Sequence, residues 1–211
     1  MASQECDCDF STSGDTVIEP DVLNFYESTY IQEPVERRGI DGNLWVWQIP
    51  DYSRDYIVVA DVARGDGNDF SAFHIFDIEE ATQVAEFKAQ IPTKDYGNLL
   101  FAIATEYNDA LLVVENANIG WAVIQQLIDR GYRNLYYSPK MDVSMTNADQ
   151  YLSRYENSQG MVPGFTTSMK TRPLVVSKMV SYLHEKSVTL RSKRLLEELR
   201  TFVWKNGKAQ A

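Results

Sequence analysis

The clearest pattern in the chain is a set of short apolar runs that are bounded by turn residues. Residues 56–60 form a continuous run of apolar and β-branched side chains that ends at Asp61. Such a run predicts a strand buried on both faces. Two more strands are predicted over 71–78 and 83–89, and the short turns between all three favour an antiparallel meander.

Helical spacing of apolar residues predicts two helices after this meander. The first runs from about 93 to 108 with Thr93 as its N-cap, and the second begins at an Asn118 cap. Between them, the apolar run 110–114 predicts a second buried strand, and a short strand is expected at 134–137. The expected order from residue 55 onward is therefore βββαβαβ.

The two ends of the chain are less regular. Residues 1–50 mix turn signals with one short apolar stretch, which indicates a connector without a long helix. Residues 138–168 are rich in small and polar side chains and predict a long loop, a feature that is usually functional. Two helices are expected after it, from 171 to about 185 and from a Ser192 cap to about 202.

Asp61 and Glu115 are the candidate chemical centre, because each directly follows a strand of the buried type. In the predicted order these two strands lie side by side and parallel, so both acids are expected at adjacent carboxyl ends, where open sheets bind ligands. Two carboxylates this close repel each other, and a proton or a cation relieves the repulsion. Oxygen ligands on rigid strands suit Mg²⁺ or Mn²⁺, which can promote phosphodiester hydrolysis. The alternative is that both acids only end strands in solvent.

Composition adds two constraints. With 211 residues, 44% hydrophobic and 24% charged, the chain is typical of one folded domain, and two cysteines are too few for a disulfide framework. The net charge of −10 is unevenly spread: residues 1–120 carry 6 basic and 23 acidic side chains, whereas residues 160–211 carry 10 basic and 3 acidic ones. This asymmetry hints at a polyanionic partner, although two solvated faces that attract each other explain the charges more simply.

Four segments, taken in order, carry a resemblance to a known family. They are D-V-A-R-G-D-G-N-D-F-S-A-F at 61–73, L-L-V-V-E-N-A-N-I-G at 111–120, P-G-F-T-T-S-M-K-T-R at 163–172 and L-E-E-L-R-T-F at 196–202. Together they resemble the nuclease domain of the large terminase subunit of tailed bacteriophages, most closely the contractile-tail type. The N-terminal Q-E-C-D-C-D-F and S-G-D-T-V-I resemble the segment that joins the packaging ATPase to this nuclease.

The resemblance implies an RNase H-like α/β fold, in which helices flank a mixed sheet made of an antiparallel three-stranded meander and two parallel strands. It implies a metal-dependent endonuclease that cuts concatemeric double-stranded DNA with little sequence specificity in the cytoplasm of the infected bacterium, and neither secretion nor membrane insertion is expected. Residues 1–50 are then a connector from an N-terminal ATPase domain, and residues 51–211 a nuclease domain truncated before its last helix. The expected partners are double-stranded DNA, the ATPase domain, the portal and the small terminase subunit.

The family's functional residues map onto this sequence one by one. Asp61 matches the first metal-binding aspartate and Glu115 the second acid, so both are expected to be catalytic and to bind Mg²⁺ or Mn²⁺. Asp69 matches an aspartate that binds metal-bound water or orients the glycine-rich turn, and capping of the turn explains it equally well. The third acid of the family lies beyond the last basic helix, and residues 203–211 contain no acid.

Five basic residues are expected to contact the phosphate backbone of DNA. They are Lys170 and Arg172, which fall in the family's Lys-Thr-Arg segment, together with Arg64, Lys193 and Arg194. Ordinary solvation of the helices is the competing interpretation, and Arg64 is equally suited to neutralise a neighbouring carboxylate.

Two other functions stay open at this point. A catalytically incomplete module on the same fold would bind DNA, the portal or the motor without cutting, and the missing third acid favours it. An actin-like phosphate-binding ATPase fragment would use Gly65 and Gly67 to approach a phosphate. That fold also needs a second phosphate loop and an adenosine-binding glycine turn, and the sequence shows neither.

Overall fold

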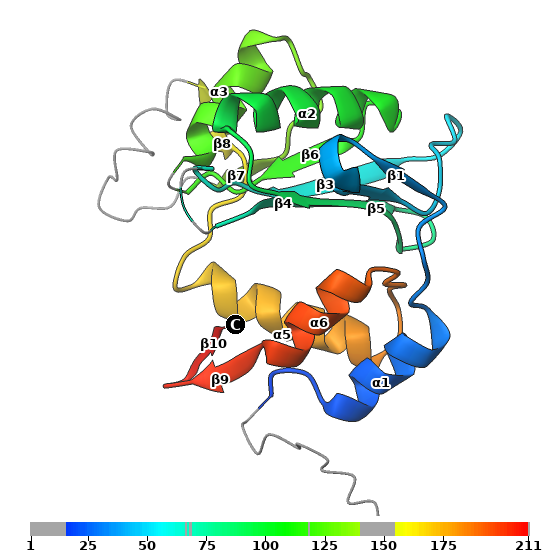
Figure 1. The fold of residues 1–211 in the computed structure, drawn as a ribbon. Coiled ribbons are helices and arrows are strands. Elements are labelled where there is room, and N and C mark those ends of the chain that lie inside the picture. Colours follow the sequence, from blue (N-terminus) through cyan, green and yellow to red (C-terminus); the bar gives the residue numbers. More distant parts are fainter. Residues whose placement is uncertain (1–15, 66, 68, 118, 140–154, 211) are drawn as a thin grey trace, which may run out of the picture.

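A computed structural model of the chain describes residues 16–65, 67, 69–117, 119–139 and 155–210. Its centre is a six-stranded mixed sheet with the strand order β1-β2-β5-β4-β3-β6 (Figure 1). The strands are β1 (Glu36–Arg38), β2 (Leu44–Val46), β3 (Tyr56–Asp61), β4 (Ser71–Asp77), β5 (Thr82–Ala89) and β6 (Leu111–Val114).

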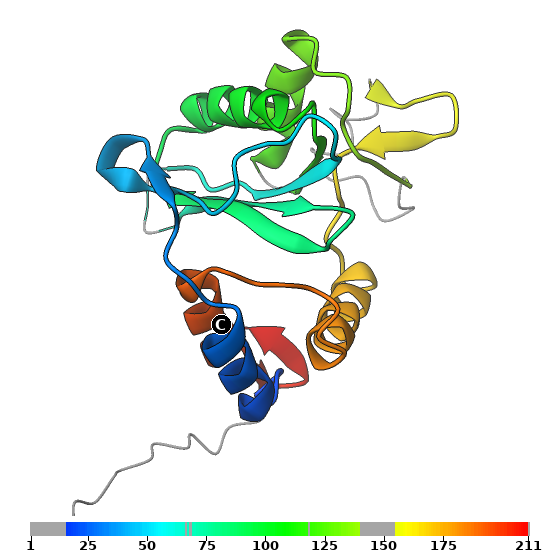
Figure 2. The same ribbon diagram turned by 90° about the vertical axis from the view of Figure 1, so that its right-hand side faces the viewer.

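Helices cover both faces of this sheet, as the two views of the ribbon show (Figures 1 and 2). One face carries α2 (Thr93–Glu106) and α3 (Gly120–Asp129), and the other carries α1 (Pro20–Thr29), α5 (Thr171–His184) and α6 (Lys193–Thr201). A single 3₁₀ turn, η1 (Ile40–Gly42), follows β1. Two small antiparallel pairs complete the fold: β7 (Tyr137–Pro139) with β8 (Met161–Pro163), and β9 (Val203–Lys205) with β10 (Lys208–Gln210).

The predicted meander and the parallel pair are both confirmed. β4 pairs antiparallel with β3 and β5, and β6 pairs parallel with β3 through the partners Ile57–Leu111 to Ala60–Val114. Between β5 and β6, α2 returns the chain across the face of the sheet. β6 can therefore lie beside β3 and run parallel to it, which is the usual crossover between parallel strands.

The hydrophobic core is divided into two clusters, one on each side of the sheet. The larger cluster packs Leu100 and Ile124 of α2 and α3 against the sheet. The smaller one joins α1, α5 and α6 around Tyr26 and Leu183. An apolar cavity of about 580 Å³ lies between the sheet and this second layer, so the two layers are not packed together throughout.

The N-terminal region departs from the expectation drawn from the sequence. Within the region of expected turn signals, Pro20 occupies the first turn of α1, where a missing backbone N–H costs no hydrogen bond. Residues 36–46, expected in a connector, supply β1 and β2, and β2 hydrogen-bonds to β5. The edge of the central sheet is therefore built from this region.

Three further details differ from the prediction. Pro92, not Thr93, precedes α2 as its N-cap, and the Thr93 hydroxyl instead donates to the carbonyl of Arg64. The strand expected at 134–137 makes only a parallel bridge from Leu135 to Leu112, and the chain then enters β7 outside the main sheet. The Asn118 cap and most of the predicted long loop lie outside the described residues. No helix in the described part is long and apolar enough to cross a membrane.

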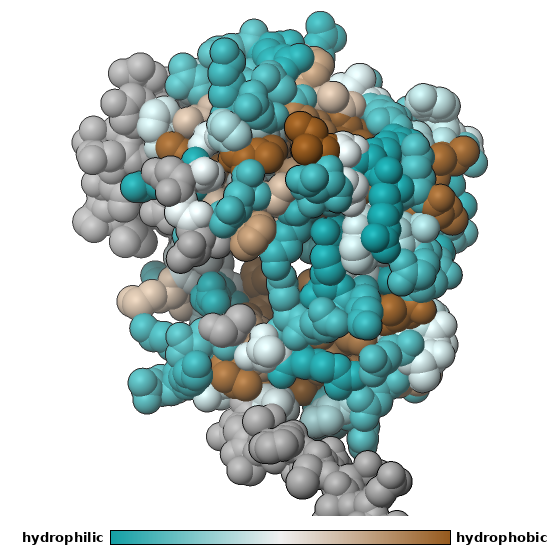
Figure 3. All heavy atoms as spheres, viewed as in Figure 1, coloured by the Kyte–Doolittle hydropathy of each residue, from teal (hydrophilic) through white to brown (hydrophobic). Residues whose placement is uncertain are grey.

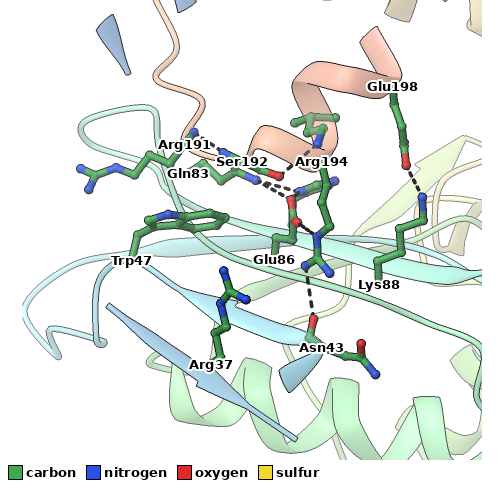
Figure 4. Close-up of polar contacts among 12 residues, drawn as sticks. Arg37, Asn43, Trp47, Gln83, Glu86, Lys88, Arg191, Ser192, Arg194 and Glu198 are labelled. Carbon is green, nitrogen blue, oxygen red and sulfur yellow. Dashed lines mark hydrogen bonds and ion pairs between the residues drawn. The ribbon is translucent and has the colours of Figure 1, made fainter. Parts of the chain in front are cut away.

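A network of polar contacts around Glu86 and Gln83 attaches α6 to the sheet (Figure 4). Glu86 of β5 is only 2% exposed and accepts a hydrogen bond from the Arg194 guanidinium. The same guanidinium lies 3.8 Å from the ring centroid of Trp45, and it also donates to the carbonyl of Asn43. Gln83 accepts from the backbone N–H groups at the start of the helix. Burial removes the Glu86 carboxylate from water, so its charge is stabilised by protein partners such as this guanidinium.

We expect Arg194→Ala to lower the free energy of unfolding by about 3 kcal/mol, because it leaves the buried Glu86 carboxylate without its cation. Urea denaturation followed by circular dichroism measures this loss. Lys193→Ala is the matched control, since Lys193 makes only an exposed pair with Glu197 and its removal should cost less than about 0.5 kcal/mol. Equal stability of the two variants would contradict the structural role of Arg194.

Candidate metal centre

Asp61 and Glu115 lie side by side at the carboxyl ends of β3 and β6. The backbone N–H of Glu115 donates to the carbonyl of Ala60 over 3.0 Å, which continues the parallel ladder by one residue and sets the two acids in neighbouring positions. Together with partial burial, the charge of Glu115 acts directly on the Asp61 carboxyl group and raises its pKa, as expected for two neighbouring acids. The Asp61 residue keeps an exposed surface although its carboxyl group is partly covered, and Glu115 is half-buried, so a ligand can reach the pair from solvent.

The electrostatics of this pair disfavour two free negative charges. Partial burial of its carboxyl group raises the pKa of Asp61, and the charge of Glu115 raises it further. Asp69 adds a smaller repulsion, while the backbone N–H of Val62 donates to Asp61 and opposes the shift. A proton shared by the pair relieves the repulsion, and a divalent cation would do so more effectively by taking its place.

The donor set fits a hard divalent cation. Two carboxylates are the usual protein contribution to a Mg²⁺ site, which keeps its other positions for water and phosphate oxygens. Within the described ranges, no cluster of three or more His, Cys, Asp and Glu side chains is placed to hold a metal ion. Asp69 therefore acts on the pair through its charge in this structure, and its expected contact with metal-bound water stays a prediction.

The turn between β3 and β4 forms a polar cavity of about 300 Å³ beside the acids, and both Asp69 and Arg64 line it. Three contacts hold this turn in place. The Ser71 hydroxyl accepts from the N–H of Ala63 over 3.0 Å, and the Gln90 amide donates to the carbonyl of Gly67 over 3.0 Å. The third is the packing of the Gly65 backbone directly against the backbone of residue 91. A Cβ atom at position 65 would lie only 2.2 Å from the carbonyl oxygen of residue 91.

Glu115 is fixed by the segment 163–165, a support that the sequence did not reveal. Phe165 donates its N–H to Val114 and accepts from that of Asn116, so the segment pairs with the end of β6. The buried Asn116 side chain donates to the carbonyl of Pro163 over 3.2 Å. The backbone on both sides of Glu115 is thus held by this segment.

Tyr96 of α2 supports the other acid. Its hydroxyl donates over 2.6 Å to the carbonyl of Ala72, the residue that pairs with Asp61 across β3 and β4. The ring is fully buried, and burial raises the pKa of Tyr96 well above its usual value, with a further rise from the charge of Asp61. Tyr96 thus remains a hydrogen-bond donor and holds the backbone opposite the acid.

The five basic residues expected to bind DNA occupy different places. Arg64 lines the cavity beside the acids, and Lys170 and Arg172 are exposed at the start of α5, shortly after the segment that supports Glu115. Arg172 also donates to the carbonyl of Ala209. Lys193 is exposed in α6, whereas the guanidinium of Arg194 is held by Glu86 and Trp45, which favours a structural role.

Solved structures with a similar fold are nuclease domains. The large terminase nuclease of thermophilic phage G20c is 18% identical, with a TM-score of 0.62 over 90% of this chain and 83% of that one. The same nuclease with bound magnesium is 20% identical, with a TM-score of 0.64 over 90% and 82%. The large terminase nuclease domain of Thermus phage P74-26 is 20% identical, with a TM-score of 0.60 over 87% and 79%. No family model and no curated protein matches the sequence.

These likenesses confirm the predicted fold class: the chain has the mixed α/β, RNase H-like fold of large terminase nuclease domains. The phage G20c nuclease has also been solved with cobalt and with zinc. At about 20% identity, the shared property is the arrangement of helices and strands.

We expect Gly120→Ala to lower the free energy of unfolding by about 2 kcal/mol, because a Cβ atom there would lie 1.8 Å from the carbonyl oxygen of Glu115. Gly67→Ala is the control, since nothing lies within 4 Å of its added Cβ atom, and its effect should stay below about 1 kcal/mol. Urea denaturation of both variants checks the difference. Similar losses in the two variants would show that the chain after β6 tolerates a side chain at position 120.

Proposed function

We propose that this chain is the metal-dependent endonuclease domain of a phage DNA-packaging terminase. The observation that carries the proposal is the Asp61–Glu115 pair at adjacent strand ends, where the backbone N–H of Glu115 donates to the carbonyl of Ala60, the residue before Asp61. The fold shared with large terminase nucleases supports it, and one of those nucleases binds magnesium. The substrate we propose is concatemeric double-stranded DNA.

In this proposal Asp61 and Glu115 hold one or two Mg²⁺ or Mn²⁺ ions. A bound divalent cation supplies Lewis-acid stabilisation of the phosphodiester and lowers the pKa of a water molecule. Ser71 and Tyr96 keep the acids and the turn in fixed positions, so no reorganisation is needed when DNA binds. Asp69 is suited to orient water in the cavity that it lines.

DNA would lie against the face formed by the start of α5 and the turn after β3. Arg64 lines the cavity beside the acids, and Lys170 and Arg172 follow the segment that supports Glu115, so we assign them to phosphate contacts. Phosphate contacts fix the register of a duplex without reading its sequence, and cleavage with little sequence specificity follows. Lys193 remains a weaker candidate, since its exposed pair with Glu197 opens at little cost.

The setting that we propose is the cytoplasm of an infected bacterium. There the ATPase domain, the portal and the small terminase subunit would be the protein partners, and assignment to the contractile-tail branch stays a prediction. The net charge of −10 slows unaided encounter with DNA, so delivery of the DNA by a motor is consistent with this composition.

A catalytically incomplete module is the second candidate. It is favoured by the absence, among the described residues, of a third acid close enough to complete a metal cluster with Asp61 and Glu115. On this alternative the chain binds DNA and one cation weakly and does not cut. No observation favours the actin-like ATPase fragment, because the similar folds are nucleases.

We expect Asp61→Asn and Glu115→Gln each to reduce plasmid nicking in Mn²⁺ by at least about a hundredfold, because each removes a charged ligand from a two-carboxylate site. Asp55→Asn is the matched control, since Asp55 is an exposed acid just before the other end of β3, and it should keep full activity. Calorimetry with Mn²⁺ is measured on the same four proteins.

These two readouts separate the candidates. Nicking by the wild-type chain that disappears in both acid variants supports the nuclease. Mn²⁺ binding that depends on both acids without nicking supports the incomplete module. Nicking and binding that are unchanged in Asp61→Asn would exclude both assignments.

We expect Lys170→Ala to weaken DNA binding and to reduce the slope of log K against log salt by about 0.9, the contribution of one phosphate contact. Lys205→Ala, an exposed lysine in β9, should leave the slope unchanged. Fluorescence anisotropy with a labelled duplex at several salt concentrations measures both. Equal slopes for the two variants would remove Lys170 from the DNA path.

A further inference from the structure

A groove of about 740 Å³ lies at the end of the sheet away from the acid pair. It is formed around the loop between β2 and β3, and its wall includes Tyr56, the first residue of the strand that ends at Asp61. Figure 1 places this loop and the carboxyl ends of β3 and β6 at opposite ends of the sheet. The groove is therefore separate from the proposed metal centre.

The groove combines exposed apolar side chains with charged ones. Three of its lining side chains are strongly exposed: Val35 at 73%, Ile49 at 68% and Tyr52 at 72%. Trp47 forms part of its wall, is itself buried, and is fixed by a hydrogen bond from its indole N–H to the carbonyl of Gln32 over 2.9 Å. Figure 3 shows hydrophobic surface at this edge of the molecule, interrupted by hydrophilic side chains. Gathered apolar surface of this kind marks an interaction site more often than scattered single residues do.

The charges around the groove determine which kind of ligand it can bind. Asp51, Asp77 and Glu80 line it, and among the described residues that line it Arg54 is the one cation. The guanidinium of Arg54 is already shared by three carboxylates, those of Asp77, Glu79 and Glu80, with its Nη2 atom 3.0 Å from Glu80 and 3.5 Å from Glu79. Arg191, outside the lining, also interacts with the charge of Glu80. Two positive charges thus face four carboxylates, and the rim keeps an excess of negative charge that an added cation would balance.

We propose that this groove docks a basic segment of another protein, with an aromatic or aliphatic side chain against Ile49 and Tyr52 and an arginine or lysine on the acidic rim. The apolar lining supplies burial, and the carboxylates supply orientation and selectivity against acidic partners. Nucleic acid does not suit the groove, because its phosphates would meet this excess negative charge. The groove volume is in the range of sites that hold a few side chains.

The test uses a fluorescein-labelled peptide in which a central tryptophan–leucine pair is flanked by two arginines on each side. One matched peptide replaces the arginines with glutamates, and another replaces the central pair with two serines. Fluorescence anisotropy measures the Kd of each peptide for the whole chain. The first peptide should bind with a Kd at least about tenfold lower than either control peptide.

The matched protein variants are Ile49→Ser/Tyr52→Ser and Ile40→Ser. The two groove side chains are mostly exposed, so the double variant should fold normally, which circular dichroism checks. It should raise the Kd for the first peptide at least about tenfold. Ile40 is 86% exposed and lies outside the groove, so its variant should bind within about twofold of the wild-type chain.

Three results would overturn the proposal. They are no binding of the basic peptide at millimolar concentration, equal binding by the double variant, and equal binding of the glutamate peptide. Light scattering on the chain alone provides a further check. A concentration-dependent dimer that disappears in Ile49→Ser/Tyr52→Ser would show that the occupant is a second copy of this chain, and would also overturn it.

Discussion

The parallel pairing of β3 with β6 is the constraint on which the candidate site depends. Its last backbone hydrogen bond, from the N–H of Glu115 to the carbonyl of Ala60, leaves Asp61 and Glu115 as neighbours. A shift of one residue in this register would turn one acid to the opposite face of the sheet. Tyr96 stabilises this register through its hydrogen bond to β4, the strand beside Asp61, and Phe165 stabilises it by pairing with the end of β6. The site is therefore as rigid as the sheet that carries it.

The sequence predicted the central part of the fold and the acid pair for a simple physical reason. A strand covered on both faces needs a continuous apolar run, and such a run is visible without knowledge of its neighbours. The runs at 56–60 and 110–114 are of this kind, and the short turns around β4 leave little choice of pairing. Once two such strands are adjacent and parallel, the acids that follow them lie at the same end of the sheet.

The remaining features depend on partners that are distant in the chain. Arg194 looked like an exposed DNA contact because nothing near it in sequence reveals Glu86, 108 positions away. Likewise, β2 is only three residues long and is a strand because β5 offers it a free edge. The helix at Pro20 was missed because the same residue types begin turns and helices, and the choice is made by packing around Tyr26.

The hydrophobic core is divided between the two faces of the sheet. The sheet with α2 and α3 holds the acid pair, whereas α1, α5 and α6 share their own cluster and contact the sheet through Phe76, the Thr82–Thr189 bridge and the polar contacts around Glu86, beside an apolar cavity. Lys170 and Arg172 belong to the helical layer and the acids to the sheet. A small displacement of this layer would therefore change the contacts with a DNA duplex without changing the distance between the two acids.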